Sequence, residues 1–381
     1  MIPYGRQEVS QADIEAVVAV LRSDWLTQGP AVPRFEEAMA RNCGSRHAVA
    51  VNSATSALHL ACLALGLGPG DSLWTSPITF VASANCGRYC GADIDFVDID
   101  PRTGNMSVEA LAAKLEQAQR PPKIIVAVDF AGLSCDMRGI RDLANRYGCA
   151  VIEDASHAVG GRYRDQPVGS CAYADITVFS FHPVKIITTG EGGMALTNDE
   201  RWAARMSSLR SHGITRDPGE MVGESDGAWH YQQLDLGYNY RMTDIQAALG
   251  MSQLNRLEEF VARRRALAER YDRLLGGLPL RLPGRDPESE SSHHLYVVGI
   301  EEGAGKTRKA VFDAMRADGI GVNVHYIPVH TQPYYQRLGF VSGDFPNAER
   351  HYAQAISLPL YPGLTDSEQD RVVEQIRRAL S

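Results

Sequence analysis

A lysine that follows an apolar run is the residue in this sequence best suited to chemistry. Residues 176–181, Ile-Thr-Val-Phe-Ser-Phe, predict a buried strand, and Lys185 comes just before a turn rich in threonine and glycine at 186–193. Lysine is rarely buried, and loss of hydration lowers the pKa of its amino group. The neutral amine is a nucleophile that condenses with carbonyl groups. The sequence therefore predicts a reactive lysine, although the glycine-rich turn lacks the spacing of a dinucleotide or Walker motif.

Two carboxylates and a histidine follow a second apolar run. Residues 149–153 predict a buried strand, and the sequence continues through Glu153, Asp154 and His157. Ligands of open α/β sheets bind at the carboxyl ends of strands, and a buried carboxylate requires a cationic partner. A protonated ring nitrogen of a cofactor would be such a partner for Asp154. A helix cap or a surface salt bridge is the alternative.

Small residues lead from a third apolar run, 48–51, directly into a predicted helix. The segment is Asn52-Ser53-Ala54-Thr55-Ser56-Ala57-Leu58. A helix N-terminus presents free N–H groups and a partial positive charge, which together favour an anion. The backbone N–H groups of Ala54 and Thr55 are therefore candidates to bind a phosphate. An ordinary N-cap formed by Ser53 or Thr55 is the alternative.

The three segments together supply an amine for an aldehyde, an acid for a pyridinium nitrogen and a phosphate seat. Those are the protein groups that pyridoxal 5′-phosphate requires. Each segment alone is compatible with a structural role, but their order, each after a predicted strand, favours a cofactor site. No metal site is expected, because His293, His294, His325 and His330 lack a clear carboxylate or cysteine complement.

Short apolar runs alternate with helical patterns from residue 45 to residue 200. The runs are nearly continuous in valine and isoleucine, which is typical of a parallel sheet flanked by helices. Helical spacing is clearest at 57–65 and 137–147. The expected strands are 48–51, 72–75, 94–97, 123–130, 149–153, 176–181 and 194–197.

The pattern changes near residue 240. Residues 243–275 predict one long helix, whose basic patch, 263–265, is expected to face solvent. A segment rich in proline, glycine and serine, 278–292, predicts a linker or loop. A smaller α/β unit is then expected, with strands 295–300 and 321–326 and helices 306–318, 347–355 and 366–379. We therefore predict an α/β fold with a large domain at 1–250 and a small one at 251–381.

The composition disfavours several classes of function. The 381 residues are 44% hydrophobic and 22% charged, as in ordinary globular proteins, and the net charge of −8 argues against broad binding to nucleic acid or anionic membrane. No apolar stretch reaches the roughly 18 residues that a spanning helix needs, and the first residues lack a signal-peptide pattern. Seven cysteines without a Cys-x-x-Cys pair predict reduced thiols in a cytoplasmic protein.

Five sequence blocks together resemble a known family. They are Ser-Ala-Thr-Ser-Ala-Leu at 53–58, Pro-Ile-Thr-Phe-Val-Ala-Ser at 77–83, Glu-Asp-Ala-Ser-His at 153–157, Ser-Phe-His-Pro-Val-Lys at 180–185 and Gly-Tyr-Asn-Tyr-Arg at 237–241. The sequence is similar to the DegT/DnrJ/EryC/StrS nucleotide-sugar aminotransferases in block order along nearly the whole chain. The resemblance implies fold type I of the pyridoxal-phosphate enzymes, with a mixed, mostly parallel sheet flanked by helices and a small C-terminal α/β domain.

The resemblance also implies roles for individual residues. Lys185 would hold the cofactor through a Schiff base, and Asp154 would pair with its ring nitrogen. Phe80 would stack on the ring, while His157 would lie near the ring hydroxyl, where many relatives have glutamine. The phosphate would be bound by Ala54, Thr55 and Ser180, and by Asn239 of a second copy, which makes the expected functional unit a homodimer with shared active sites.

Within the family, the sequence is most similar to the transaminases of pseudaminic acid biosynthesis. This implies L-glutamate as donor and UDP-2-acetamido-2,6-dideoxy-β-L-arabino-hex-4-ulose as acceptor at C4. The residues implied around the nucleotide-sugar are Tyr4, Asp24, Trp25, Leu26, Thr27, Val324, His325, Tyr326 and Ile327. Core packing is the alternative for Trp25 and Tyr326, because aromatic side chains supply both core area and stacking surfaces.

Three other functions are weighed against this one. A transaminase for another nucleotide-linked keto-sugar, such as one forming perosamine, stays open. A sugar dehydratase on the same scaffold would have histidine in place of the Schiff-base lysine, so Lys185 argues against it. A non-enzymatic cofactor-binding regulator would need a DNA-binding unit, and the acidic chain offers no recognition helix.

Overall fold

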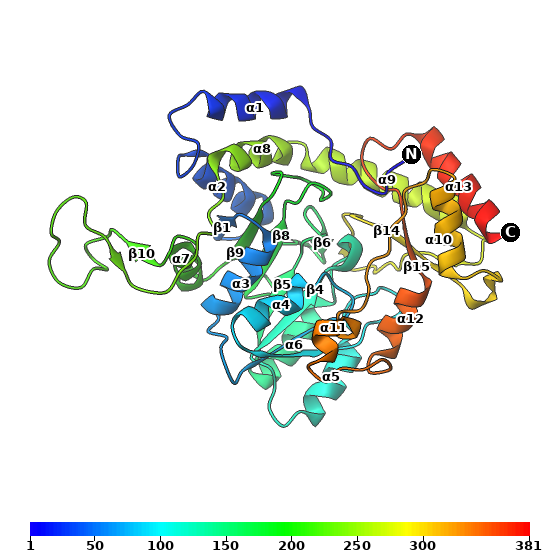
Figure 1. Ribbon diagram of the computed structural model, residues 1–381, viewed down its shortest axis with the longest axis horizontal. Coiled ribbons are helices and arrows are strands. Elements are labelled where there is room, and N and C mark those ends of the chain that lie inside the picture. The colour runs from blue at the N-terminus through cyan, green and yellow to red at the C-terminus, as the bar shows by residue number, and fades with distance from the viewer.

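A seven-stranded sheet forms the centre of the computed structural model, which describes residues 1–381 (Figure 1). The strand order is β1-β9-β8-β5-β4-β2-β3, and only β9 runs against the others. The strands are β1 (His47–Val51), β2 (Ser72–Thr75), β3 (Asp93–Phe96), β4 (Ile124–Val128), β5 (Ala150–Asp154), β8 (Ile176–Ser180) and β9 (Gly193–Thr197). The predicted mixed, mostly parallel sheet is confirmed.

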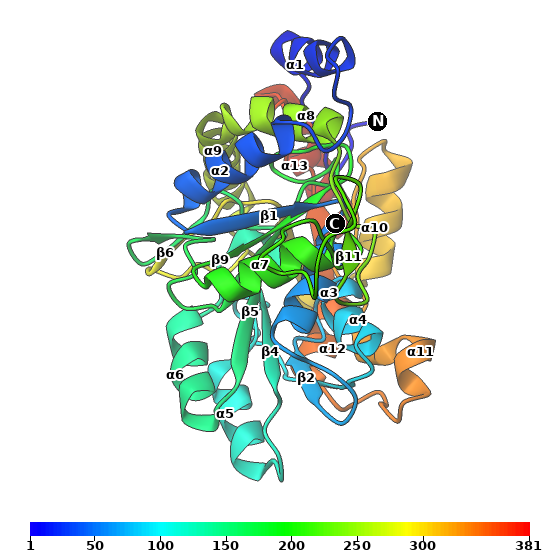
Figure 2. The same ribbon diagram turned by 90° about the vertical axis from the view of Figure 1, so that its left-hand side faces the viewer.

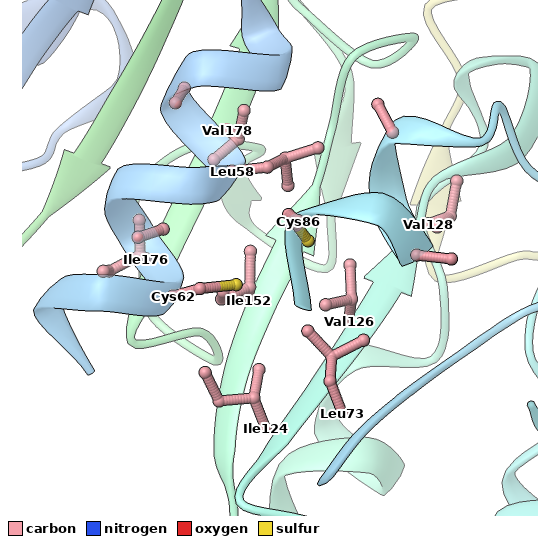
Figure 3. Close-up of a cluster of buried hydrophobic side chains, with 14 of the residues drawn as sticks. Leu58, Cys62, Leu73, Cys86, Ile124, Val126, Val128, Ile152, Ile176 and Val178 are labelled. Atoms are coloured by element: carbon pink, nitrogen blue, oxygen red, sulfur yellow. The ribbon is translucent and has the colours of Figure 1, made fainter. Parts of the chain in front are cut away.

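Both faces of the sheet are covered, which explains the continuous apolar runs. Along β4, Ile124, Val126 and Val128 pack against α3 (Ala54–Ala64) and α4 (Ala82–Tyr89) on one face. Figure 3 shows these side chains between the strands and Leu58 and Cys62 of α3. Ile125 and Ala127 pack on the other face against α5 (Val108–Gln117) and α6 (Met137–Tyr147). Successive strand residues point to opposite faces, so both sets must be apolar.

Three further helices complete the large unit and surround the sheet edge at β1. They are α2 (Ala31–Cys43), α7 (Glu200–Leu209) and α8 (Asp244–Leu254), with α1 (Gln11–Leu21) packed on α8. Short strand pairs lie outside the main sheet: β6 (Arg162–Tyr163) with β7 (Gln166–Pro167) and β13 (Ser289–Glu290), and β10 (Ile214–Thr215) with β11 (Gln232–Gln233).

A second, antiparallel sheet of order β12-β14-β15 lies toward the C-terminus. Its strands are β12 (Leu280–Arg281), β14 (Tyr296–Ile300) and β15 (Ala355–Leu358), and its core includes side chains from α9 (Leu257–Leu275), α10 (Arg308–Ala317) and α13 (Asp366–Leu380). The remaining helices are α11 (Pro333–Gln336) and α12 (Pro346–Gln354), with single turns of 3₁₀ helix at Phe130–Gly132, Glu302–Ala304 and Val329–Thr331.

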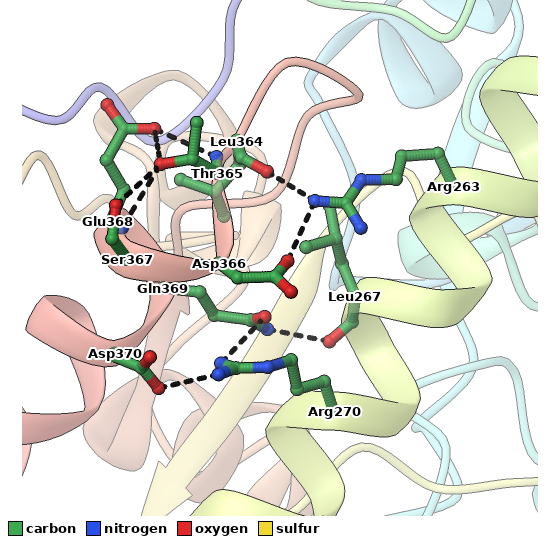
Figure 4. A network of polar contacts seen from close by, with 10 residues as sticks. All are labelled: Arg263, Leu267, Arg270, Leu364, Thr365, Asp366, Ser367, Glu368, Gln369 and Asp370. Atoms are coloured by element: carbon green, nitrogen blue, oxygen red, sulfur yellow. Dashed lines mark hydrogen bonds and ion pairs between the residues drawn. The ribbon is translucent and has the colours of Figure 1, made fainter.

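Polar contacts fasten α9 to α13 at the edge of this second core (Figure 4). Arg263 donates hydrogen bonds to the Leu364 carbonyl at 2.7 Å and to Asp366 at 3.1 Å. The fully buried Gln369 donates to the Leu267 carbonyl at 2.7 Å and accepts from Arg270 at 3.3 Å. Buried polar groups need such partners, so these contacts fix how the last helix lies on α9.

The structure corrects three predictions in the second half of the chain and adds a strand that the sequence did not predict. The helix expected at 243–275 is two helices, α8 and α9, separated at residues 255–256. The strand expected at 321–326 is absent: Asn323 forms the one isolated bridge within that range, and Ile320 forms another just before it. Strand β15 was not predicted. The basic patch 263–265 does not all face solvent, because Arg264 is fully buried.

A hairpin around β10 and β11 extends away from the body of the molecule (Figure 1). It carries several large apolar side chains that are exposed, including Val222, Trp229 and Leu236. In side view the hairpin lies over α7 and α3 (Figure 2). All seven cysteines are free, and six of them are buried. None of the helices combines the length and apolarity required to span a membrane.

Candidate active site

A cavity of about 450 Å³ opens at the carboxyl ends of β4, β5 and β8. Parallel strands bring their carboxyl ends to one sheet edge, where α/β proteins bind ligands. The volume lies within the roughly 300–1,000 Å³ of small-molecule sites. Its lining includes these predicted residues: Tyr4, Ala54, Thr55, Phe80, Asp154, His157, Ser180, Lys185, His325 and Tyr326.

Lys185 lies in the turn after β8, as predicted, with its side chain in the cavity. Its backbone N–H donates to the His182 carbonyl at 2.9 Å, which closes the turn. Loss of hydration lowers the pKa of the Lys185 amine to about 8, and the negative charge of Asp154 opposes this shift. The amine is therefore far more often neutral near pH 8 than that of an ordinary lysine.

Asp154 ends β5 and is buried. One carboxylate oxygen accepts a hydrogen bond from the Ser83 hydroxyl at 2.6 Å. The other accepts from the Ser156 hydroxyl at 2.6 Å and from the Ser156 backbone N–H at 3.2 Å. These three donors hold the carboxylate in one orientation.

The first turn of α3 forms a third wall of the cavity. The Ser53 hydroxyl accepts from the Ser56 backbone N–H at 3.2 Å, so Ser53 is the N-cap. The capping alternative is thus correct and does not exclude the anion site, because the N–H groups of Ala54 and Thr55 have no intrahelical acceptor. Ser180, at the end of β8, lines the same part of the cavity.

Gly193 allows the backbone of β9 to lie against this turn. A β-carbon at Gly193 would be 2.4 Å from the Ala54 nitrogen, so Gly193→Ala must displace the start of α3. We predict at least about a tenfold loss of affinity for pyridoxal 5′-phosphate, measured by absorbance titration, because anion binding depends on those N–H groups. Gly68→Ala is the matched control, since a β-carbon there meets nothing within 4 Å. Equal affinities for the two variants would contradict the role of this turn.

Histidine and tyrosine side chains form the remaining wall. His157 Nε2 lies 3.0 Å from the Tyr326 hydroxyl, and the His157 ring is 4.5 Å from that of His294. Burial holds the pKa of His157 and of His294 well below the usual value, and lowers that of His325 to about 3. These imidazoles are therefore neutral at physiological pH.

Other predicted residues lie outside this cavity. Asn239 and the segment 24–27 (Asp24, Trp25, Leu26 and Thr27) are exposed, as is Ile327, and neither they nor Val324 line the cavity. Trp25 is 55% exposed, so the alternative that it packs in the core is wrong. Of the nine residues predicted around the nucleotide-sugar, Tyr4, His325 and Tyr326 line the cavity of their own chain.

Sequence reasoning missed Ser83, Ser156 and His294 as members of the site. Two of them had a local signal: Ser156 lies two residues after Asp154, and Ser83 lies one helical turn beyond Phe80. His294 had none, because it lies between the predicted linker, 278–292, and the predicted strand, 295–300, and was considered only as a metal ligand. His182 is exposed and also lines the cavity.

Known proteins are similar to this chain in sequence and in architecture. Residues 7–377 match the model of the DegT/DnrJ/EryC1/StrS aminotransferase family. The spore coat polysaccharide biosynthesis protein SpsC of Bacillus subtilis is 42% identical over 381 residues, which is 99% of this chain and 96% of that protein. PseC of Helicobacter pylori, an aminotransferase involved in the biosynthesis of pseudaminic acid, has TM-score 0.90 and 31% identity, covering 100% of this chain and 99% of PseC.

Spr1654 of Streptococcus pneumoniae, named as a sugar aminotransferase, superposes in its PMP form with TM-score 0.91 and 31% identity over 100% of this chain and 99% of that chain. It was also solved in a PLP form. The cavity fits this cofactor: the buried carboxylate of Asp154 has hydroxyl and N–H donors but no ion-pair partner in the protein, and Lys185 has an amine of lowered pKa. The chain belongs to the DegT/DnrJ/EryC1/StrS family and is a sugar aminotransferase that uses pyridoxal 5′-phosphate.

Proposed function

We infer that the protein transfers the amino group of L-glutamate to C4 of a UDP-linked 4-keto-6-deoxy-N-acetylhexosamine, as in pseudaminic acid biosynthesis. The amine of Lys185, whose pKa burial lowers to about 8 in the cavity that Asp154 also lines, is the observation that carries the transamination. The likeness to PseC over the whole chain supports the sugar, and the likeness to SpsC supports a role in making surface polysaccharide. The proposed location is the cytoplasm.

Each catalytic residue has one task in this proposal. Pyridoxal 5′-phosphate, when bound, supplies an electron sink for a carbanion beside nitrogen. Asp154 holds the proton on the ring nitrogen, and the Lys185 amine removes the proton from the α-carbon of glutamate. In the second half of the reaction Lys185 delivers a proton to C4 of the sugar.

Binding and orientation fall to the other residues of the cavity. Phe80, 60% exposed and lining the cavity, offers its ring for stacking. Ala54, Thr55 and Ser180 hold the phosphate. Three arginines, Arg6, Arg210 and Arg241, are candidates to bind the glutamate carboxylates. Arg210 already pairs with Glu36, which leaves Arg6 and Arg241.

A second copy of the chain completes the proposed site. Asn239 and residues 24–27 are exposed and lie outside the cavity of their own chain, while apolar side chains of the β10–β11 hairpin stand in solvent. Large exposed apolar patches mark interaction surfaces. We therefore place Asn239 and residues 24–27 at the partner's cavity in a homodimer. A monomer mass by light scattering at working concentration would contradict this arrangement.

The substrate is tested by offering keto-sugars on different nucleotides. Purified protein with pyridoxal 5′-phosphate and glutamate is incubated with UDP-2-acetamido-2,6-dideoxy-β-L-arabino-hex-4-ulose or with a GDP-4-keto-6-deoxyhexose. The expected product is a UDP-4-amino-sugar, identified by mass spectrometry and by NMR at C4. Amination of the GDP-sugar alone would instead support a perosamine-type transaminase.

A further inference from the structure

Both ring nitrogens of His157 already have partners in the protein. The backbone N–H of Ala131 donates to His157 Nδ1 at 3.3 Å, and His157 Nε2 lies 3.0 Å from the Tyr326 hydroxyl. The imidazole is buried and neutral. His157 therefore has no free ring nitrogen with which to bind a ligand directly.

The contact with Ala131 fixes the tautomer of His157. A nitrogen that accepts a hydrogen bond carries no proton, so the single proton of the neutral ring is on Nε2. His157 Nε2–H consequently donates to the Tyr326 oxygen. The Tyr326 hydroxyl must then donate its own proton elsewhere, and it has no other hydrogen-bond partner in the chain. Tyr326 lines the cavity, so a ligand oxygen is the available acceptor.

The backbone that presents this N–H is held in an unusual conformation. Ala131 has φ +59°, a left-handed conformation that a residue with a side chain keeps only where its surroundings impose it. The surroundings do so here: the Leu295 N–H donates to the Ala131 carbonyl at 3.2 Å, and the Ser292 N–H donates to the Gly132 carbonyl at 3.0 Å. The Ser292 hydroxyl also donates to the His157 carbonyl at 2.9 Å. Strain retained beside a ligand cavity indicates a functional constraint.

The strand order shows which edge of a bound ring faces Tyr326 and His157. Ser180 ends β8, and the start of α3 lies against β9, both on one side of Asp154. Ala131 follows β4, on the other side. In pyridoxal the aldehyde lies opposite the ring nitrogen, with the phosphate arm on one flank and the hydroxyl on the other. With the phosphate at Ser180, the ring hydroxyl faces the β4 side.

We propose that Tyr326 donates its hydroxyl proton to the ring oxygen of the cofactor, and that His157 is a positioning residue that orients Tyr326 rather than a direct ligand. This rests on the proposed roles of Lys185, Asp154 and the phosphate-binding residues. The other titratable groups around the pair are Tyr4, Asp154, Lys185, His294 and His325.

A pH titration of the cofactor's absorbance in the loaded protein, without substrate, tests the proposal. A hydrogen bond to the ring oxygen stabilises its negative charge, which favours loss of the proton shared between that oxygen and the Lys185 nitrogen. Tyr326→Phe should therefore raise the pH midpoint by about one unit, a tenfold gain in proton affinity. His157→Asn is expected to raise it similarly, because the shorter side chain cannot reach Tyr326.

Matched variants separate positioning from general disturbance. His157→Gln places an amide donor near the former Nε2, and Ala131→Gly keeps the N–H while accepting a positive φ, so both should titrate like the wild type. Tyr326→Phe combined with His157→Asn should shift no further than Tyr326→Phe alone. An unchanged midpoint in Tyr326→Phe, or additive shifts in the double variant, would overturn the proposal. If Tyr326→Phe does not fold, His157→Asn against His157→Gln gives the same comparison.

The two proposals can fail separately. A protein that titrates as expected but aminates no UDP-keto-sugar contradicts the proposed substrate and leaves the Tyr326 hydrogen bond supported. A protein that makes the UDP-amino-sugar but shows no shift in Tyr326→Phe contradicts the hydrogen bond alone.

Discussion

Replacing Lys185 by alanine is expected to abolish both the covalent capture of the cofactor and turnover. The variant should lack the near-ultraviolet and visible absorbance of the covalent form, and borohydride should leave no label on the protein. Transamination should fall by at least about 10²-fold, because the nucleophile and the proton-transfer group are lost together. Absorbance, intact-protein mass after borohydride reduction and a coupled glutamate assay measure the three effects.

The low pKa of Lys185 explains the size of this effect. With a pKa of about 8, roughly a quarter of the Lys185 amines are neutral at pH 7.5, against about one in a thousand for an ordinary lysine. Lys306→Ala is the control, since Lys306 is exposed and outside the cavity. Borohydride labelling that persists in Lys185→Ala at the wild-type level would refute the assignment.

Loss of folding is not expected to explain the Lys185→Ala result. The folded pKa is below the unfolded one, so between about pH 8 and 10.4 the folded state binds fewer protons and stability decreases as pH falls. Below that range the folded protein carries the full cost of a desolvated charge. Removing the amine removes this cost, so the unloaded variant should melt no lower than the unloaded wild type at pH 7.

Asp154→Asn is expected to give a protein that still captures the cofactor but transaminates slowly. The neutral amide cannot hold a proton on the ring nitrogen, and its NH₂ group would face donors from Ser83 or Ser156. Loss of one electrostatic stabiliser typically lowers kcat by about 10²–10³-fold. Single-turnover absorbance changes with glutamate measure the first half-reaction directly.

The neighbouring carboxylate provides the control for Asp154→Asn. Glu153 points to the opposite face of the sheet, where the Thr177 hydroxyl donates to it at 2.8 Å, and burial raises its pKa to about 7. Glu153→Gln should change stability more than rate. If Asp154→Asn transaminates at a rate near that of Glu153→Gln, the ring nitrogen has another partner.

Local sequence patterns predicted the part of the site that lies at strand ends. Lys185 and Asp154 each follow a run of buried residues, and the direction of parallel strands brings such ends together. Contacts between distant segments gave no local signal. Ser83 and Asp154 are 71 residues apart, and His157 and Tyr326 are 169 apart. Hydrophobic periodicity indicates which residues are buried but not which residues they meet.

The second half of the chain was harder to predict for related reasons. The strand expected at 321–326 has the right composition, but its only bridge joins Asn323 to Ser357 of β15, whose ladder is formed with β14. Arg264 resembled a solvent-facing residue between two other arginines. It is buried because the carbonyls of His293, His294 and Leu360 accept its N–H donors, and backbone acceptors have no signature in a sequence.

The burial of the thiols has a practical consequence. Six of the seven cysteines are buried in the folded chain, and Cys171 is the exception. A disulfide reagent such as Ellman's can modify a buried thiol only after the surrounding structure opens. The buried thiols are therefore probes of local opening. Slow release of the chromophore at neutral pH would report how often the structure around them opens, including where α3 and α4 hold Cys62 and Cys86 against the sheet.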